Sequence, residues 1–378
     1  MPDHRVLVIG AGIAGLTASR TLALLGARVD LVERQTVIGG HAAQFSCKAT
    51  ERCVKCGACL VTEAAAAAVS DPRVTIHTAS RVQELRRTPQ RFEFAIERIE
   101  DQTLAPGRAA GTGHAPAPPS AAWADAVVLS AGFEVFDPGD KAYGHGIFPN
   151  VLTNLELERR LRRQGRLTRP SDGAAPQRVA FIQCVGSRDA QRGHLWCSQF
   201  CCAAALRAGL RIKAINAATE ITVFYIDIQS FGRDFDRFYE QSRQSLRFVR
   251  AVPIEAFEIE NAGIRLGYTE GALKPFVEEV FDLVVLSTGM VPAAGLAAIA
   301  QQLGLAPVSG GFAAAAADIG IFVAGTVRGP MGIADSMADA RHAAAGVLAF
   351  LERRRGQPDA PAAPFEPSPR DMPVTQDA

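Results

Sequence analysis

Four cysteines occupy the position where an α/β protein usually binds its ligand, which is the carboxyl end of a strand and the helix that follows. In the stretch 178–205, a buried-type strand ends at Cys184. A polar connection containing glycine follows, and then a helical pattern carries Cys197, Cys201 and Cys202. On a helix, Cys197 and Cys201 share one face, and Cys202 lies about 100° from Cys201. We predict that the four thiolates surround a compact inorganic centre, which a helix N-terminus would also favour.

A dinucleotide-binding pattern begins the chain, because residues 5–34 have the order strand, tight turn, helix and second strand. Gly10, Gly12 and Gly15 have the G-x-G-x-x-G spacing, in which the first allows the turn, the second the approach of a pyrophosphate and the third close helix packing. Glu33 closes the second strand, where a carboxylate accepts hydrogen bonds from an adenosine ribose. The predicted site also includes Ile13, Ala14 and Arg34.

Downstream segments favour FAD over NAD. Residues 38–41 resemble the second phosphate-contacting segment of flavoproteins with two dinucleotide domains, and 124–133 and 281–290 resemble the strands by which those proteins leave and re-enter the flavin domain. Residues 320–347 resemble their C-terminal flavin motif, with Thr326 where many members have Asp. The predicted flavin contacts here are Gly39, Gly40, His41, Ala131, Gly132, Gly289, Gly325, Thr326, Gly332 and Ile333.

The other cysteine group consists of Cys47, Cys53, Cys56 and Cys59. Its C-x-x-C-x-x-C core is similar to part of a ferredoxin cluster run, although the fourth ligand lies upstream and no proline follows. An iron–sulfur cluster, a labile cluster lost on isolation, a zinc site and a thiol pair near the flavin are all compatible with this spacing.

Length and composition favour a two-domain cytoplasmic protein. A chain of 378 residues exceeds one ordinary core, and a net charge of +1 argues against a dedicated nucleic-acid binder. The sequence has no apolar run long enough to cross a bilayer and no room for a signal peptide before the strand at Arg5. In the cytoplasm, cysteines are metal or redox ligands more often than disulfides.

Local patterns predict the remaining elements. We expect a short helix over 63–69, antiparallel strands over 73–79 and 91–97, and a mobile hairpin tip without chemistry over 105–122. A strand and an aromatic-rich helix over 220–242 should supply core side chains. The expected division is a discontinuous FAD domain over 1–147 and 279–350, an inserted domain over 148–278, and a disordered tail over 351–378.

The inserted domain lacks the second glycine fingerprint that would bind NAD(P)H in a disulfide reductase. Residues 184–189, Cys-Val-Gly-Ser-Arg-Asp, stand in its place. Arg188 and Asp189 either support a metal centre or form a simple ion pair in the turn.

Six segments together resemble the A subunit of heterodisulfide reductases. The resemblance is closest to the short form found in the heterodisulfide reductase-like complexes of sulfur-oxidising bacteria. The likeness covers residues 5 to about 350. Its motifs are the glycine turn, IGGHAAQ (38–44), FIQCVGSRD (181–189), C-x3-C-C (197–202), FYIDIQSFG (224–232) and AGTVRGPMGIADS (324–336).

This resemblance implies a thioredoxin-reductase-like α/β fold with an iron–sulfur cluster in place of the second nucleotide. It also implies one FAD, a [4Fe–4S] cluster on Cys184, Cys197, Cys201 and Cys202, a homodimer, and docking to iron–sulfur B/C-like subunits. The sequence lacks the long ferredoxin-like extensions of the methanogen form, so electron bifurcation is not implied.

The expected function is therefore electron transfer in cytoplasmic sulfur oxidation, with cofactor chemistry and no side-chain acid or base. One alternative is a self-contained NAD(P)H-dependent disulfide reductase that uses Cys56 with Cys59 or Cys53. Another is a non-catalytic assembly module stabilised by two zinc ions.

Overall fold

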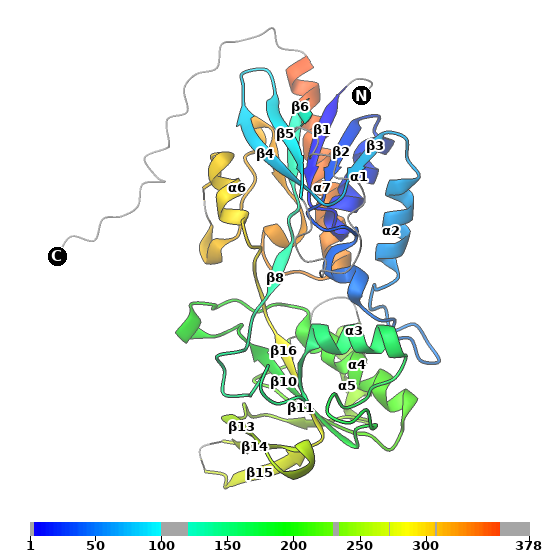
Figure 1. The fold of residues 1–378 in the computed structure, drawn as a ribbon, viewed down its shortest axis with the longest axis vertical. Helices are drawn as coiled ribbons and strands as arrows, with labels where there is room; N and C mark the ends of the chain where they lie inside the picture. Colours follow the sequence, from blue (N-terminus) through cyan, green and yellow to red (C-terminus); the bar gives the residue numbers. More distant parts are fainter. Residues whose placement is uncertain (1–3, 100–119, 230–233, 272, 307, 356–378) are drawn as a thin grey trace, which may run out of the picture.

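A computed structural model describes residues 4–99, 120–229, 234–271, 273–306 and 308–355. Two α/β bodies lie one above the other along the longest axis (Figure 1). The expected hairpin tip over 105–119, residues 230–232 of the FYIDIQSFG motif and the tail beyond residue 355 lie outside the described residues.

The upper body in Figure 1 is built on a parallel sheet with the order β18-β7-β1-β2-β3. Its strands are β1 (Arg5–Ile9), β2 (Arg28–Val32), β3 (Val74–His77), β7 (Ala126–Leu129) and β18 (Ile321–Val323). One face packs on helices α1 (Ile13–Leu24), α2 (Leu60–Val69) and α7 (Ile333–Arg355). The other face packs on antiparallel strands β4 (Ser80–Arg87), β5 (Phe92–Arg98) and β6 (Ser120–Ala124) and on helix α6 (Leu296–Gln302). Both faces are covered, which explains the continuous apolar runs of β1 and β7.

The lower body repeats this plan with a parallel sheet of order β12-β11-β10-β16-β9. Its strands are β9 (Val151–Thr153), β10 (Arg178–Val185), β11 (Glu220–Phe224), β12 (Arg247–Val249) and β16 (Leu283–Thr288). Helices α3 (Asn154–Gln164), α4 (Cys201–Ile215) and α5 (Phe235–Arg243) supply the core on one face. Antiparallel strands β13 (Glu255–Glu258), β14 (Ile264–Thr269) and β15 (Phe276–Phe281) cover the other.

A two-stranded antiparallel neck, β8 (Phe133–Val135) and β17 (Met290–Pro292), connects the bodies. The described 3-10 turns are η1 (Gly40–Gln44), η2 (Ala190–Arg192), η3 (Glu260–Ala262), η4 (Ser309–Gly311), η5 (Ala317–Ile319) and η6 (Gly325–Val327). No helix in the described part of the chain is long and apolar enough to span a membrane.

Three features of the fold differ from the sequence prediction. The pattern of 281–290 predicts a strand of the flavin domain, but β16 pairs with β10 and β9, so the lower body extends beyond 278 to Thr288. Strand β3 is predicted to be antiparallel, but it lies parallel to β2. Helix α7 continues to Arg355, so residues 351–355 are helical rather than part of a tail. Long-range strand pairing decides the first two of these features, and local patterns do not encode it.

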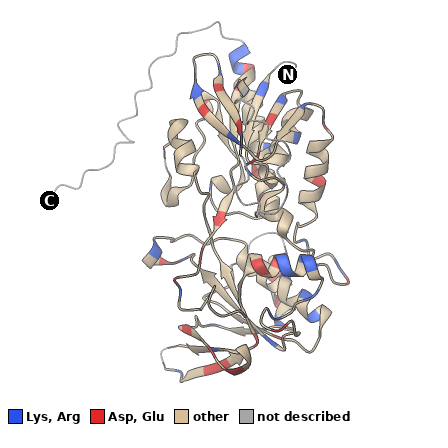
Figure 2. Cartoon of the chain, in the orientation of Figure 1, with Lys and Arg blue, Asp and Glu red and all other residues tan. Residues whose placement is uncertain are grey.

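Charged side chains are distributed unevenly over the lower body. Figure 2 shows basic residues along α3 and acidic residues on the three-stranded sheet. Helix α3 carries Arg159, Arg160, Arg162 and Arg163, and it faces the upper body. Its first turn is fixed by a capping box in which the Thr153 side chain and backbone pair with Glu156.

Candidate functional site

The glycine turn after β1 has the geometry that a bound pyrophosphate needs. Gly10 has φ +100, a conformation that favours glycine, and a Cβ on Gly15 would lie 1.8 Å from the Gly10 carbonyl oxygen. A Cβ on Gly12 would meet no described atom within 4 Å, so the backbone there is open to a ligand. These positions fit the three roles that the spacing predicts.

Glu33 is held in place below this turn. Its carboxylate is buried and accepts hydrogen bonds from the amides of Ala11 at 2.8 Å and Gln35 at 2.9 Å. Each oxygen keeps further acceptor capacity, so a ribose hydroxyl could bind without displacing either amide. The residues present therefore fit the dinucleotide.

Other predicted flavin residues converge on the same sheet edge. Gly39 bridges to Gly12, and the His41 ring lies 4.5 Å from that of Phe133 in the neck. Gly325 packs against Ala14, where its Cβ would be 2.6 Å from that of Ala14. The remaining members of the predicted set are Ile13, Arg34, Gly40, Ala131, Gly132, Thr326, Gly332 and Ile333.

Gly289 does not join this group. It follows β16, and a Cβ there would lie 2.9 Å from Ser187 Cβ and 3.0 Å from Ser198 Oγ. Its strand belongs to the lower sheet, and the flavin contact expected at Gly289 stays a prediction.

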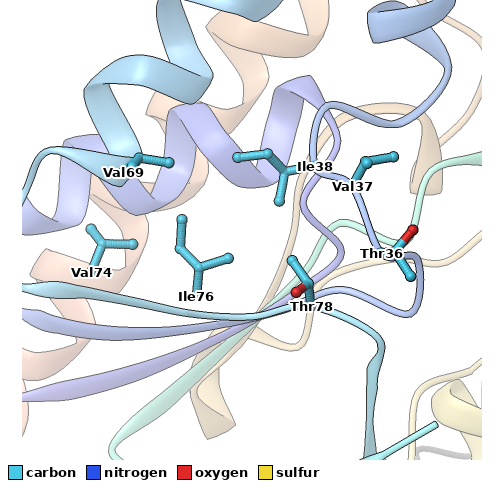
Figure 3. A pocket seen from close by; sticks show the side chains of 7 residues that line it. All are labelled: Thr36, Val37, Ile38, Val69, Val74, Ile76 and Thr78. Carbon is cyan, nitrogen blue, oxygen red and sulfur yellow. The ribbon is translucent and has the colours of Figure 1, made fainter. Parts of the chain in front are cut away.

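An open groove of about 560 Å³ lies between α2, β3 and the segment after Glu33 (Figure 3). Its lining residues are Thr36, Val37, Ile38, Val69, Val74, Ile76 and Thr78. The lining contains no titratable side chain, and we assign it no chemistry.

The first cysteine group lies on the loop between η1 and α2. Cys47, Cys53 and Cys59 are exposed and Cys56 is half-buried. A Cβ on Gly57 would lie 3.3 Å from Ile333, so the loop passes the predicted flavin turn.

This loop is also bound by the lower body. A buried ion pair joins Lys48 to Glu158 of α3, and Glu158 also accepts from the Ser46 amide at 2.9 Å. On α4, Arg207 donates to the Val54 carbonyl at 2.9 Å. Arg211 donates to the Ala49 carbonyl at 3.1 Å.

The second cysteine group gathers where β10 meets the start of α4. Cys201 and Cys202 begin α4 and are buried, whereas Cys184 is the last residue but one of β10 and has φ +61. The sequence predicts Cys197 on the helix, but it lies in the preceding loop, because Gln199 has φ +63 and breaks the helical path. The α-helical spacing argument for Cys197 is therefore wrong.

The four thiols are close enough to influence one another's protonation. Burial, then the neighbouring Cys202, raises the pKa of Cys184 to about 11. Burial also raises the pKa of Cys197. The hydrogen bond from Cys201 to Cys202 raises the pKa of Cys201 and lowers that of Cys202 to about 7.

The segment after β11 completes the surroundings of these thiols. Asp227 binds Arg188 with both carboxylate oxygens, and the Gln229 amide donates to Cys202. Asp189 pairs instead with Lys141, at 2.5 Å. The sequence prediction assigns Asp227 and Gln229 no role, although both lie in the FYIDIQSFG motif.

Buried polar atoms without partners test whether this region fits a metal centre. Among the described residues, no group of three His, Cys, Asp or Glu side chains is arranged to hold a single metal ion. However, the side chains of Gln183, Ser187 and Ser287 are buried around Cys184 and make no hydrogen bond within the described structure. Such groups suit a ligand that accepts hydrogen bonds, as sulfide and thiolate do.

Comparison with known proteins gives one family model and a set of similar relatives. The model for an NAD(P)-binding Rossmann-like domain matches residues 8–68. The iron–sulfur A subunit (form 2) of the CoB–CoM heterodisulfide reductase of Methanopyrus kandleri is 31% identical over 92% of this chain and 64% of the relative. The A subunit of the H2:CoB–CoM heterodisulfide, ferredoxin reductase of Methanothermobacter marburgensis is 29% identical over 91% of this chain and 63% of the relative. The chain is similar to heterodisulfide reductase A subunits over most of its own length.

The chain spans just under two thirds of the length of those relatives. Among solved structures, T. acidophilum thioredoxin reductase gives a TM-score of 0.60 at 15% identity, covering 93% of this chain and all of that one. Lactococcus lactis thioredoxin reductase gives a TM-score of 0.60 at 14% identity, covering 93% of this chain and all of that one. At such identities the likeness concerns the fold alone, and it confirms the thioredoxin-reductase-like architecture.

Proposed function

We propose that this chain is an electron-transfer oxidoreductase component that binds FAD in the upper body and a [4Fe–4S] cluster in the lower body. The observation that carries the proposal is the gathering of Cys184, Cys197, Cys201 and Cys202 at the sheet edge where a second dinucleotide would otherwise bind. When bound, FAD exchanges electrons in pairs and the cluster exchanges them singly.

The roles of the chain's own residues follow from their contacts. Gly10, Gly12 and Gly15 admit the pyrophosphate, Glu33 accepts from the ribose, and the turn at 325–332 presents the start of α7 to the flavin. Around the thiols, Arg188 brings positive charge that its pair with Asp227 holds in place. Low exposure of Cys201 and Cys202 excludes water from the centre.

The wider setting is also part of the proposal. We place the protein in the cytoplasm as a homodimer that docks to iron–sulfur B/C-like subunits and acts in sulfur oxidation. The first cysteine group, next to Gly57 and Ile333, would hold a second redox centre.

Anaerobic isolation followed by absorption spectroscopy and iron, zinc and FAD analysis tests the assignment. We expect a yellow-brown protein that bleaches on reduction. Cys201→Ser should lose the iron of one cluster and keep FAD, because a hydroxyl is a poor iron ligand. Ala204→Ser, on the same helix, should keep both. Full iron in Cys201→Ser would contradict the ligand assignment, and zinc in place of iron would favour the assembly module.

The alternative of a stand-alone disulfide reductase is favoured by one contact, that of the Cys56–Cys59 loop with Ile333. It predicts steady NADPH oxidation by the purified chain. We expect none, because the lower body has cysteines where a nicotinamide dinucleotide would need a glycine turn.

A further inference from the structure

Strand β10 contains a bulge at the residues that lead into the cysteine site. Ile182 pairs with Leu286 and Val185 with Thr288, so Gln183 and Cys184 together oppose the single residue Ser287. A bulge of this kind adds one residue and re-aims the side chains next to it.

The core contacts show which way these side chains face. Ile182 and Val185 both belong to the core shared with β13–β15, whereas Val285 belongs to the core under α3, α4 and α5. Gln183 and Cys184 lie between two residues of the first core, so the bulge turns both toward the helices. Ser287, two residues after Val285, lies on the same face. Helix α4, which begins with Cys201, covers this face.

Gln183 and Ser287 are buried there without partners. Gln183 is 3% exposed and Ser287 is 1% exposed. Neither amide atom of Gln183 and no oxygen of the Ser287 side chain finds a hydrogen-bond partner in the described part of the molecule. Because both amide atoms are unpaired, the conclusion is the same for either orientation of the amide. An unpaired buried donor destabilises a fold, so its presence beside Cys184 points to a ligand.

We propose that Gln183 and Ser287 donate hydrogen bonds to the sulfur atoms of the metal centre and thereby raise its reduction potential. This inference rests on the proposed function, since it requires a cluster on the four cysteines. Hydrogen bonds to cluster sulfurs are one of the ways in which a protein sets the potential, and a water-excluded site strengthens them. Gln183 and Ser287 are positioning residues and are not ligands.

The test uses the full chain, isolated anaerobically with its cofactors. Gln183→Met keeps the length of the side chain and removes the donor, and Ser287→Ala removes the hydroxyl. Each should shift the midpoint potential of the cluster, measured by redox titration followed by electron paramagnetic resonance, to more negative values. Iron and FAD contents should match the wild type.

A matched control is available in the upper body. Ser19 of α1 is also fully buried with an unpaired hydroxyl among the described residues, but it lies in the other body. Ser19→Ala should leave the potential unchanged. An unchanged potential in both Gln183→Met and Ser287→Ala, with full iron, would overturn the inference. Iron lost from Gln183→Met while FAD is retained would also overturn it, because a residue that only donates to the sulfur atoms is not needed to hold the iron.

A second measurement does not need the cluster. In chelator-treated, iron-free protein, Gln183→Met should raise the thermal unfolding midpoint, because it removes an unpaired buried amide. A lower midpoint would mean that the amide has a partner within the protein, and would count against the inference. Wild-type protein isolated without iron would contradict the proposed function itself, and this inference with it.

Discussion

Among single residues of the flavin site, Glu33 has the best-defined surroundings. It is 8% exposed, and backbone amides on both sides fix its carboxylate. The amide of Ala11 belongs to the glycine turn itself, so Glu33 couples the position of that turn to the end of β2. A group held in this way reaches a ribose without losing further side-chain freedom on binding.

We expect Glu33→Gln to weaken FAD binding by about tenfold, because the new NH2 group faces a backbone N–H donor and a charged acceptor is lost. Fluorescence titration of the FAD-free protein measures the dissociation constant. Glu255→Gln, an exposed change of the same kind on β13, is the control. Equal affinity in Glu33→Gln and wild type would show that the ribose does not contact this carboxylate.

At the scale of elements, an ionic network attaches the three-stranded sheet to the lower parallel sheet. Glu279 of β15 accepts from Arg247 of β12 at 2.7 Å and from Arg178 of β10 at 2.7 Å. These hydrogen bonds, Arg247 first, lower the pKa of Glu279 to about 2. One carboxylate therefore joins three strands.

The pH dependence of stability should reflect this network. The pKa of Glu279 is lower in the folded state than in the unfolded chain, at about 4.3. Its contribution is therefore complete above that value and is lost as pH falls through about 2. Glu279→Gln should lower the free energy of unfolding by about 1 kcal/mol at pH 7, allowing for solvent screening, and by less near pH 3.

Urea unfolding at a series of pH values measures this difference. The adjacent Glu278→Gln is the control, since Glu278 is exposed and its nearest arginine contact is 3.6 Å long. A difference between Glu279→Gln and wild type that stays constant from pH 7 to pH 3 would contradict the assignment.

At the scale of the whole molecule, the two bodies are joined at the neck and at the loop of the first cysteine group. The neck contributes β8 and β17, and the loop contributes the buried Lys48–Glu158 pair. Contacts of Arg207 and Arg211 place α4 against the same loop. Helix α4 thus begins at one cysteine group and contacts the segment that carries the other.

Breaking the pair from one side should be strongly destabilising. Glu158→Gln leaves Lys48 buried without a counter-charge, so we expect a loss of roughly 3 kcal/mol in the free energy of unfolding. The double variant Lys48→Met with Glu158→Gln should be close to wild type, because both charges are then absent and an acceptor for the Ser46 amide remains. Thermal unfolding measures the stability. Limited proteolysis measures whether the loop of the first cysteine group detaches from α3. Arg163→Gln, exposed on α3, is the control. Equal losses in the single and double variants would show that the loop is held by other contacts.

Features that depend on neighbours along the chain can be predicted from the amino-acid sequence. The spacing of Gly10, Gly12 and Gly15 defines a turn that only glycines can form, and the buried-type runs of β1 and β10 indicate two parallel sheets. The division of the cysteines into two groups of four is likewise evident from their spacing in the sequence. These features follow from steric limits and hydrophobic periodicity, which act locally.

Three features depend on the folded chain: the sheet that β16 joins, the position of Cys197 before α4, and the placement of Gln183 and Asp227 near the thiols. A fully buried strand has the same composition in either body, so its pattern does not identify its partner. The bulge at Cys184 arises from pairing with a strand about a hundred residues away, and it alone turns Gln183 and Cys184 to one face. Side-chain direction at the site is therefore a property of long-range strand pairing, which the local sequence does not specify.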